Sequence, residues 1–219
     1  MIRLVLGVIG LAGVLIALPL LFAGGSLYWA DAVFADADGF INSNTMDIEV
    51  DGFALVAGPA DIEDLPEIPD SPIALGEIAT LRIQAQSLDD ETKLFIGAAP
   101  AALLDEYLGG VPYAVFDDTD EGEMFLSYRM NATQGPLLLP AEQPFWFQST
   151  TGTGMQELEW ELTEGDVSLV VMNADASDGM AIETVVGVRI PVLKPVGIGL
   201  LVGGGAALAL SVLLLTVVL

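Results

Sequence analysis

The chain has 219 residues, and 31 acidic residues against six basic ones give a net charge of −25. This balance excludes a nucleic-acid-binding surface, which needs clustered Lys and Arg, and it disfavours docking on anionic lipid headgroups. The chain has no Cys and no His, which excludes disulfides and thiol chemistry and removes the commonest general base and transition-metal ligand. The acidic excess has three explanations: a halophilic surface adapted to high salt, which we favour, a calcium-binding surface, or a charged domain that resists aggregation.

The chain begins with an apolar run, Leu4–Ala23, whose 20 residues suffice to cross a bilayer core as a helix. A cleaved signal peptide is the alternative, because Ala30-Asp31-Ala32 resembles a small-x-small cleavage site. The apolar part of a signal peptide usually spans only about 7–15 residues, however. Tyr28 and Trp29 also stand where an interfacial aromatic belt would lie. We therefore expect residues 1–30 to form a retained N-terminal signal anchor.

The middle segment, residues 31–191, is acidic and long enough to bury its own core. Its patterns predict a mainly β fold, an antiparallel β-sandwich with one short helix. Alternation in Thr80–Gln86 places Leu81, Ile83 and Ala85 inward and Arg82, Gln84 and Gln86 outward, and alternation in Met155–Leu162 places Trp160 in the core. The other strands are expected at Met46–Val56, Lys93–Ala98, Met124–Met130, Phe145–Ser149, Val167–Met172 and Met180–Ile190.

One helix is expected between these strands. It begins at Pro100, carries an apolar stripe that includes Leu104 and Leu108, and ends at Gly109-Gly110. The segment Gly58–Leu75, rich in Pro and acidic residues, is expected to be a rigid acidic loop.

The stretches LFIGAAPAALLDEYLGGVPY and PFWFQSTTGTGMQELEWELTEGDVSLVVMNAD resemble an uncharacterised family of two-span membrane proteins of actinobacteria and haloarchaea. The second stretch also resembles the small jelly-roll modules appended to secreted proteases. The resemblance covers residues 76–188. It implies an extracytoplasmic, jelly-roll-like β domain between two membrane helices, and it implies no catalytic residues.

Two acidic segments are candidate sites for a hard cation such as Ca²⁺. Asp117, Asp118 and Asp120 belong to a run of five carboxylates in seven residues, and Asn173, Asp175 and Asp178 resemble part of a calcium loop. In the second segment the Gly comes one place late and Thr184 stands where a Glu ligand is usual. A solvated loop and a hairpin turn are the respective alternatives.

Asn131-Ala132-Thr133 is a formal N-glycosylation sequon, and it precedes Gly135-Pro136, which indicates a surface loop. No residues stand out as catalytic. Ser149 and Ser168 have no His to activate them, and no pair of carboxylates is distinguished among the 31. We expect no cofactor and no enzymatic activity.

The chain ends with an uncharged apolar run, Val196–Leu219, which predicts a second membrane helix within residues 192–219. Gly199, Gly203, Ala207 and Ser211 share one face of that helix, and Gly13 with Ala17 offers a similar notch on the first. Small residues allow close helix packing, either within the chain or between copies.

Arg3 precedes the first span and acidic residues follow it, so both termini are expected in the cytoplasm and the middle segment outside. Lys194, at the outer edge of the second span, opposes this orientation weakly. We expect a non-catalytic binding or assembly module in the cell membrane, such as an accessory subunit or a self-assembling envelope component. Its partners would be the lipid bilayer and either further copies or other membrane and envelope proteins. The alternatives are a cation-binding or sensory ectodomain, and a hydrolase that uses acidic residues alone.

Overall fold

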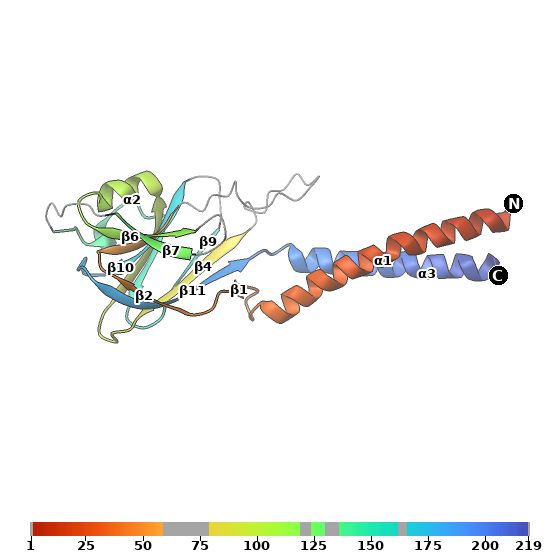
Figure 1. Cartoon of the computed structure of the whole chain (residues 1–219), viewed down its shortest axis with the longest axis horizontal. Helices are drawn as coiled ribbons and strands as arrows, with labels where there is room; N and C mark the ends of the chain where they lie inside the picture. Colours follow the sequence, from red (N-terminus) through yellow and green to blue (C-terminus); the bar gives the residue numbers. More distant parts are fainter. Residues whose placement is uncertain (1, 59–78, 119–123, 130–135, 162–165, 219) are drawn as a thin grey trace. The chain divides into compact units, whose positions relative to one another are not determined.

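A computed structural model describes residues 2–58, 79–118, 124–129, 136–161 and 166–218, as shown in Figure 1. The chain divides into two compact units. One contains residues 1–41 and 190–219, and the other contains residues 42–189.

The first unit contains two long apolar helices, α1 (Ile2–Phe34) and α3 (Leu193–Val218). Each is long and apolar enough to cross a membrane, and only 11% of the residues in the most apolar stretch of each are buried. Helix α1 continues beyond the apolar run through Tyr28 and Trp29, and Pro19 lies within it. The two terminal apolar helices predicted from the sequence are thus confirmed as helices.

The two helices pack against each other along a seam of small residues. Among the described side chains of the two helices, the buried residues are Gly10, Ala17 and Gly24 in α1 and Gly197, Gly204 and Ser211 in α3, each set with a seven-residue spacing. A Cβ on Gly10 would lie 2.9 Å from Leu215, and one on Gly24 would lie 2.8 Å from the carbonyl oxygen of Gly197. The helices are therefore antiparallel, and their backbones approach closely only because these positions lack larger side chains.

This seam corrects part of the prediction from small residues. Gly13 and Ala17 do face α3, since a Cβ on Gly13 would overlap the Ser211 hydroxyl and Ala17 is fully buried. At Gly199 and Gly203, however, a Cβ would meet no atom within 4 Å beyond its chain neighbours and the backbone of its own helix. Of the face predicted from the four-residue spacing, Ser211 does lie in the seam, but Gly199 and Gly203 do not, because α3 follows α1 with the seven-residue period of an antiparallel pair.

The second unit consists of two mostly antiparallel sheets. The first has the strand order β1-β11-β4-β9, with β2 also paired to β11. Its strands are β1 (Ile41–Asn42), β2 (Met46–Val50), β4 (Thr80–Ser87), β9 (Gln156–Glu161) and β11 (Met180–Arg189). The second sheet has the order β7-β6-β3-β10-β5-β8. Its strands are β3 (Ala54–Ala57), β5 (Leu94–Pro100), β6 (Tyr113–Asp118), β7 (Met124–Arg129), β8 (Gln148–Gly152) and β10 (Val167–Asn173). The pair β3–β6 is parallel, which departs from the all-antiparallel expectation.

The two sheets share one hydrophobic core, so a β-sandwich fits the structure. The first sheet contributes residues such as Ile48, Ile83, Leu158 and Ile182, and the second contributes residues such as Leu55, Leu94, Ile96, Leu169 and Val171. The other face of the second sheet forms a second core with the helix α2 (Ala101–Leu108), which contributes Leu104 and Leu108. The second sheet is therefore covered on both faces, which explains why β5 and β10 are apolar without alternation.

Several predicted strands are shifted. The single strand expected at Met46–Val56 is two strands, β2 and β3, in different sheets. Gly52 lies between them, where a Cβ would come within 2.9 Å of the Pro112 carbonyl oxygen. The strand expected at Phe145–Ser149 begins instead at Gln148, after a short 3₁₀ helix, η3 (Pro140–Glu142), and β6 was not anticipated.

Two side chains differ from the simple alternation pattern. Ile83 and Ala85 are buried as predicted, but Arg82 is buried too, only 4% exposed, and its Nη2 donates to Asn42 Oδ1 at 2.9 Å. Trp160 is only partly buried against the first core, where it stacks on Phe147 with ring centroids 5.6 Å apart. Residues 59–78, which contain most of the acidic loop expected at Gly58–Leu75, lie outside the described residues.

Candidate functional site

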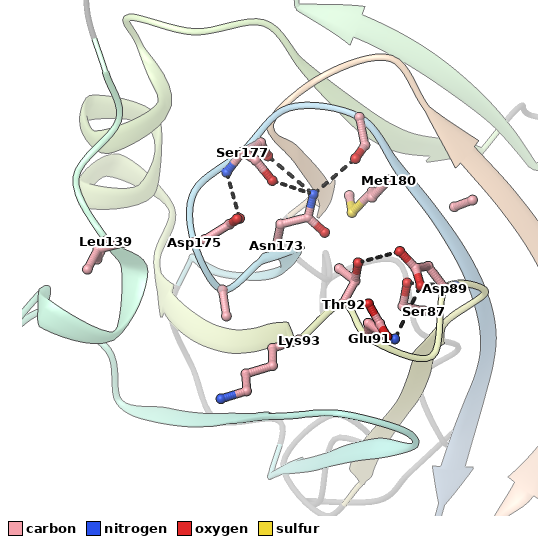
Figure 2. A pocket seen from close by; sticks show the side chains of 13 residues that line it. Ser87, Asp89, Glu91, Thr92, Lys93, Leu139, Asn173, Asp175, Ser177 and Met180 are labelled. Carbon is pink, nitrogen blue, oxygen red and sulfur yellow. Dashed lines mark hydrogen bonds between the residues drawn. The ribbon is translucent and has the colours of Figure 1, made fainter.

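A cleft of about 660 Å³ with many polar side chains in its lining lies at one end of the β-sandwich, and Figure 2 shows it from close by. Two connections form most of it, the loop between β4 and β5 and the turn between β10 and β11, and Leu139, just before η3, also lines it. These connections meet because β10 pairs with β5, with Asn173 opposite Leu94, and because Ala174 N donates to the Lys93 carbonyl oxygen at 2.9 Å. We refer to this cavity as the turn cleft.

The β10–β11 turn is held by its own polar side chains. Asn173, at the end of β10, is only 4% exposed, and its Nδ2 donates to Ser177 Oγ and to the Gly179 carbonyl oxygen, both at 3.0 Å. Ala176 and Gly179 adopt positive φ values of 58° and 73°. The turn therefore uses Asn173 as an internal brace, in agreement with the hairpin-turn alternative for this segment.

Asp175 occupies the same turn and is held in its charged form. Its Oδ1 accepts a hydrogen bond from the Ser177 backbone N at 3.0 Å. Hydrogen bonds from the side chain and backbone of Ser177 lower the pKa of Asp175 below its ordinary value. The turn cleft thus presents a carboxylate that resists protonation, which is the opposite of what a general acid requires.

The β4–β5 loop contributes the other charges. Asp89 organises this loop, because its Oδ1 accepts from Glu91 N at 3.2 Å and its Oδ2 accepts from Thr92 Oγ1 at 3.0 Å. Glu91 and Lys93 are exposed at the edge of the cleft. The carboxylates of Asp89, Glu91 and Asp175 therefore outnumber the ammonium group of Lys93 in the lining.

The wall of the cleft also has an apolar part. Leu139, Ala174, Met180 and Ala181 line the cleft together with the polar side chains of Ser87, Thr92 and Ser177. A cavity with a few fixed polar groups and an apolar wall is typical of small-ligand sites.

A second hollow, of about 530 Å³, lies beside α2 and has a more aromatic and aliphatic lining, which includes Leu103, Tyr107, Leu138 and Phe145. Tyr107 Oη donates to the Leu138 carbonyl oxygen, and burial raises the pKa of Tyr107 well above its ordinary value. Trp146 packs between Phe145 and Phe95 and donates from Nε1 to the Pro140 carbonyl oxygen at 2.7 Å. These contacts fasten the segment before β8 to the second core, so we interpret the aromatic group as structural.

The predicted site residues do not assemble into one place. Asn173 and Asp175 line the turn cleft, whereas Asp178 belongs to the same turn but not to the lining. Asp117 and Asp118 end β6, but their side chains are not described, and Asp120 and Asn131 lie outside the described residues. Among the described residues no three acidic side chains come together as a metal site requires. The cation site and the glycan at Asn131 stay predictions.

Sequence reasoning missed the β4–β5 loop as part of a site. The run Asp89-Asp90-Glu91 was a visible signal, but acidic runs occur elsewhere in this chain. Only the pairing of β5 with β10 brings Asp89 and Glu91 to the same cleft as Asn173. No protein-family model and no curated protein matches this sequence.

Proposed function

We propose that the chain is a two-span protein of the cell membrane that holds its β domain outside the cytoplasm as a non-catalytic binding or assembly module. The observation that carries this proposal is the small-residue seam between α1 and α3. An antiparallel pair of apolar helices, covered only along one narrow seam, leaves most of its apolar surface for lipid. The segment between the helices then begins and ends on the same side of the bilayer.

The charges of the helical unit support an outward β domain. Arg3 marks the cytoplasmic end of α1. Lys194, which opposed this orientation, forms an ion pair with Asp31, with Nζ and Oδ2 3.2 Å apart. Because the Asp31 carboxylate offsets the ammonium charge, Lys194 has less weight as a cytoplasmic signal. Both termini would then lie in the cytoplasm.

A binding role fits the turn cleft better than hydrolysis. Hydrolysis by acidic residues alone needs a carboxyl group with a raised pKa, and in this cleft Asp175 has a lowered one. We further propose that the domain is a jelly-roll-like sandwich related to the two-span family that the sequence resembles. Its acidic surface would be adapted to high salt.

The absence of cysteine from the chain gives a direct test of the orientation. We would introduce a single cysteine at Thr153, an exposed residue of the β domain, or at Ile2, and treat intact cells with a membrane-impermeant maleimide. The expected result is labelling of Thr153→Cys in intact cells and of Ile2→Cys only after permeabilisation. Labelling in the reverse pattern would refute the extracytoplasmic placement.

Assembly and sensing are separated by two further measurements. Light scattering of the protein purified in mild detergent at high salt shows a defined oligomer if the chain assembles with itself, and co-purifying proteins identify a partner. A cation sensor would instead show a saturable stabilisation by Ca²⁺ that exceeds the effect of NaCl at the same ionic strength.

A further inference from the structure

We propose that the turn cleft binds a small organic cation with a primary ammonium group and an alkyl chain, a ligand of the polyamine class. This inference rests on the binding role proposed above and gives that role a ligand class. Four features of the cleft carry it: a buried amide oxygen without a donor, an excess of carboxylates, several apolar lining residues, and a suitable volume.

The first feature is the side-chain oxygen of Asn173. This atom is buried and has no hydrogen-bond partner, although the residue lines the cleft. Figure 2 shows it on the side of Thr92 and Met180, within the ring of lining side chains. A 180° flip of the side-chain amide would not give this oxygen a donor, because the oxygen would then face the backbone carbonyl oxygens of Ser177 and Gly179, to which Nδ2 donates. A buried acceptor without a donor is unfavourable, so a donor group at this point would stabilise the site.

The second feature is the sign of the surrounding charge. The carboxylates of Asp89, Glu91 and Asp175 line the same cleft, and among the described residues Lys93 is the only basic one that does so. Each hydrogen bond that Asp89 and Asp175 make within their turns comes from a neutral donor, so their negative charges are not offset there. A cationic N–H donor matches both the amide oxygen and the carboxylates.

A metal ion fits these groups less well than an ammonium group does. A hard cation such as Ca²⁺ takes six to eight oxygen ligands around one point. In the described part of the chain no three acidic side chains come together in that way. An ammonium group needs fewer acceptors, and these can be spread along an extended ligand.

The remaining features concern the body of the ligand. Leu139, Ala174, Met180 and Ala181 are apolar members of the lining, against which methylene groups would pack. The volume of about 660 Å³ lies within the range of small-molecule sites. An alkyl amine uses both the polar and the apolar parts of this lining, whereas a bare cation uses only the first.

The experiment is isothermal titration calorimetry of the full chain in mild detergent, with spermidine as the probe and a fixed high ionic strength. We compare two double variants that remove the same charge. Glu91→Gln with Asp175→Asn neutralises two lining residues, and Asp90→Asn with Asp178→Asn neutralises their neighbours in the same loop and turn, which do not line the cleft. Far-UV circular dichroism checks that both variants are folded.

We expect saturable binding of spermidine to the wild type, a loss of about tenfold or more in affinity in the first double variant, and a change of about twofold or less in the second. Equal losses in the two variants would show attraction by net charge alone and would overturn the proposal, as would the absence of saturable binding. Tighter saturation by Ca²⁺ than by spermidine would overturn it in favour of a metal site.

These outcomes are independent of the cysteine-labelling experiment. If spermidine does not bind but cysteine labelling places the β domain outside the cytoplasm, the proposed membrane-anchored module is retained and only this ligand is refuted. Binding by a domain that proves to be cytoplasmic would refute the proposed function while retaining the site.

Discussion

The seam between α1 and α3 makes a prediction that three consecutive glycines can test. A Cβ on Gly204 would lie 2.9 Å from Leu21 Cγ, 3.1 Å from Leu21 N and 3.2 Å from the Ala17 carbonyl oxygen. On Gly203 and Gly205 a Cβ would meet nothing within 4 Å. Substitution by Ala at each of these positions therefore changes the helix propensity equally but the packing only at Gly204.

The magnitude follows from these two terms. Gly→Ala in a helix interior gains about 1 kcal/mol of helix propensity. Overpacking a close contact costs about 1–3 kcal/mol, and two of the three atoms around Gly204 are backbone atoms, which cannot move away alone. Since the propensity gain is common to the three variants, Gly204→Ala is expected to be less stable than Gly203→Ala and Gly205→Ala by about 1–3 kcal/mol.

The assay is an SDS titration of the purified protein in mixed micelles. Dyes on cysteines introduced at Leu4 and Thr216 report helix separation by energy transfer, and the cysteine-free chain leaves the labels unique. Gly204→Ala should dissociate at a lower SDS fraction than its two neighbours. Three variants with the same midpoint would show that the helices do not pack along this seam.

Three further predictions concern the β domain. Leu104→Ala should lower the free energy of unfolding by about 2–5 kcal/mol, because Leu104 is 1% exposed. Leu103→Ala is the control, and because Leu103 is 41% exposed its effect should stay within about 0.5 kcal/mol. Equal effects of the two substitutions in chemical denaturation would contradict the packing of α2. Because the pKa of Asp175 is lowered in the folded state, its charged form adds stability above the pKa of the unfolded chain, and this is lost as the pH falls through the folded-state pKa. Asp175→Asn should therefore slightly destabilise the folded domain at pH 7 but not at a pH below the folded-state pKa of Asp175. Asp178→Asn is the control in the same turn. A stability difference between Asp175→Asn and the wild type that does not change with pH would refute this linkage. Raising the NaCl concentration from 0.1 to 1 M shortens the screening length from about 10 Å to about 3 Å. Because the chain has a net charge of −25, this screening weakens its self-repulsion and should raise the melting temperature. Full stability in dilute buffer would count against the halophilic interpretation.

The turn cleft shows how a structural motif and a binding site can share residues. Asn173 uses its amide nitrogen to brace the β10–β11 turn and leaves its oxygen buried and without a donor beside the cleft. A turn that holds this amide rigidly also fixes the position of the oxygen, so a ligand would meet a preorganised acceptor. The same argument explains why the segment looked like an incomplete calcium loop, since both uses need Asn, Asp and Gly in a tight turn.

The sequence by itself determined the two long apolar helices, the mainly β character of the segment between them, and α2. Each depends on a local property: an uninterrupted apolar run, period-two alternation, or Pro before and Gly after an apolar stripe. Local patterns were sufficient for these elements because each face of such an element contacts a single environment along its length, such as the protein core or the solvent. They failed where the surroundings change, as at Arg82, whose outward position is nonetheless buried.

Only the tertiary structure decided which elements are neighbours. The helix seam uses a seven-residue period that is visible only once α1 and α3 are paired, so the four-residue stripe included Ser211, which lies in the seam, but also Gly199 and Gly203, which do not. The turn cleft likewise joins Asp89 with Asn173, which are distant in sequence, through the register of β5 on β10. Strand pairing and helix pairing are set by the packing of whole faces, so no short stretch of sequence contains them.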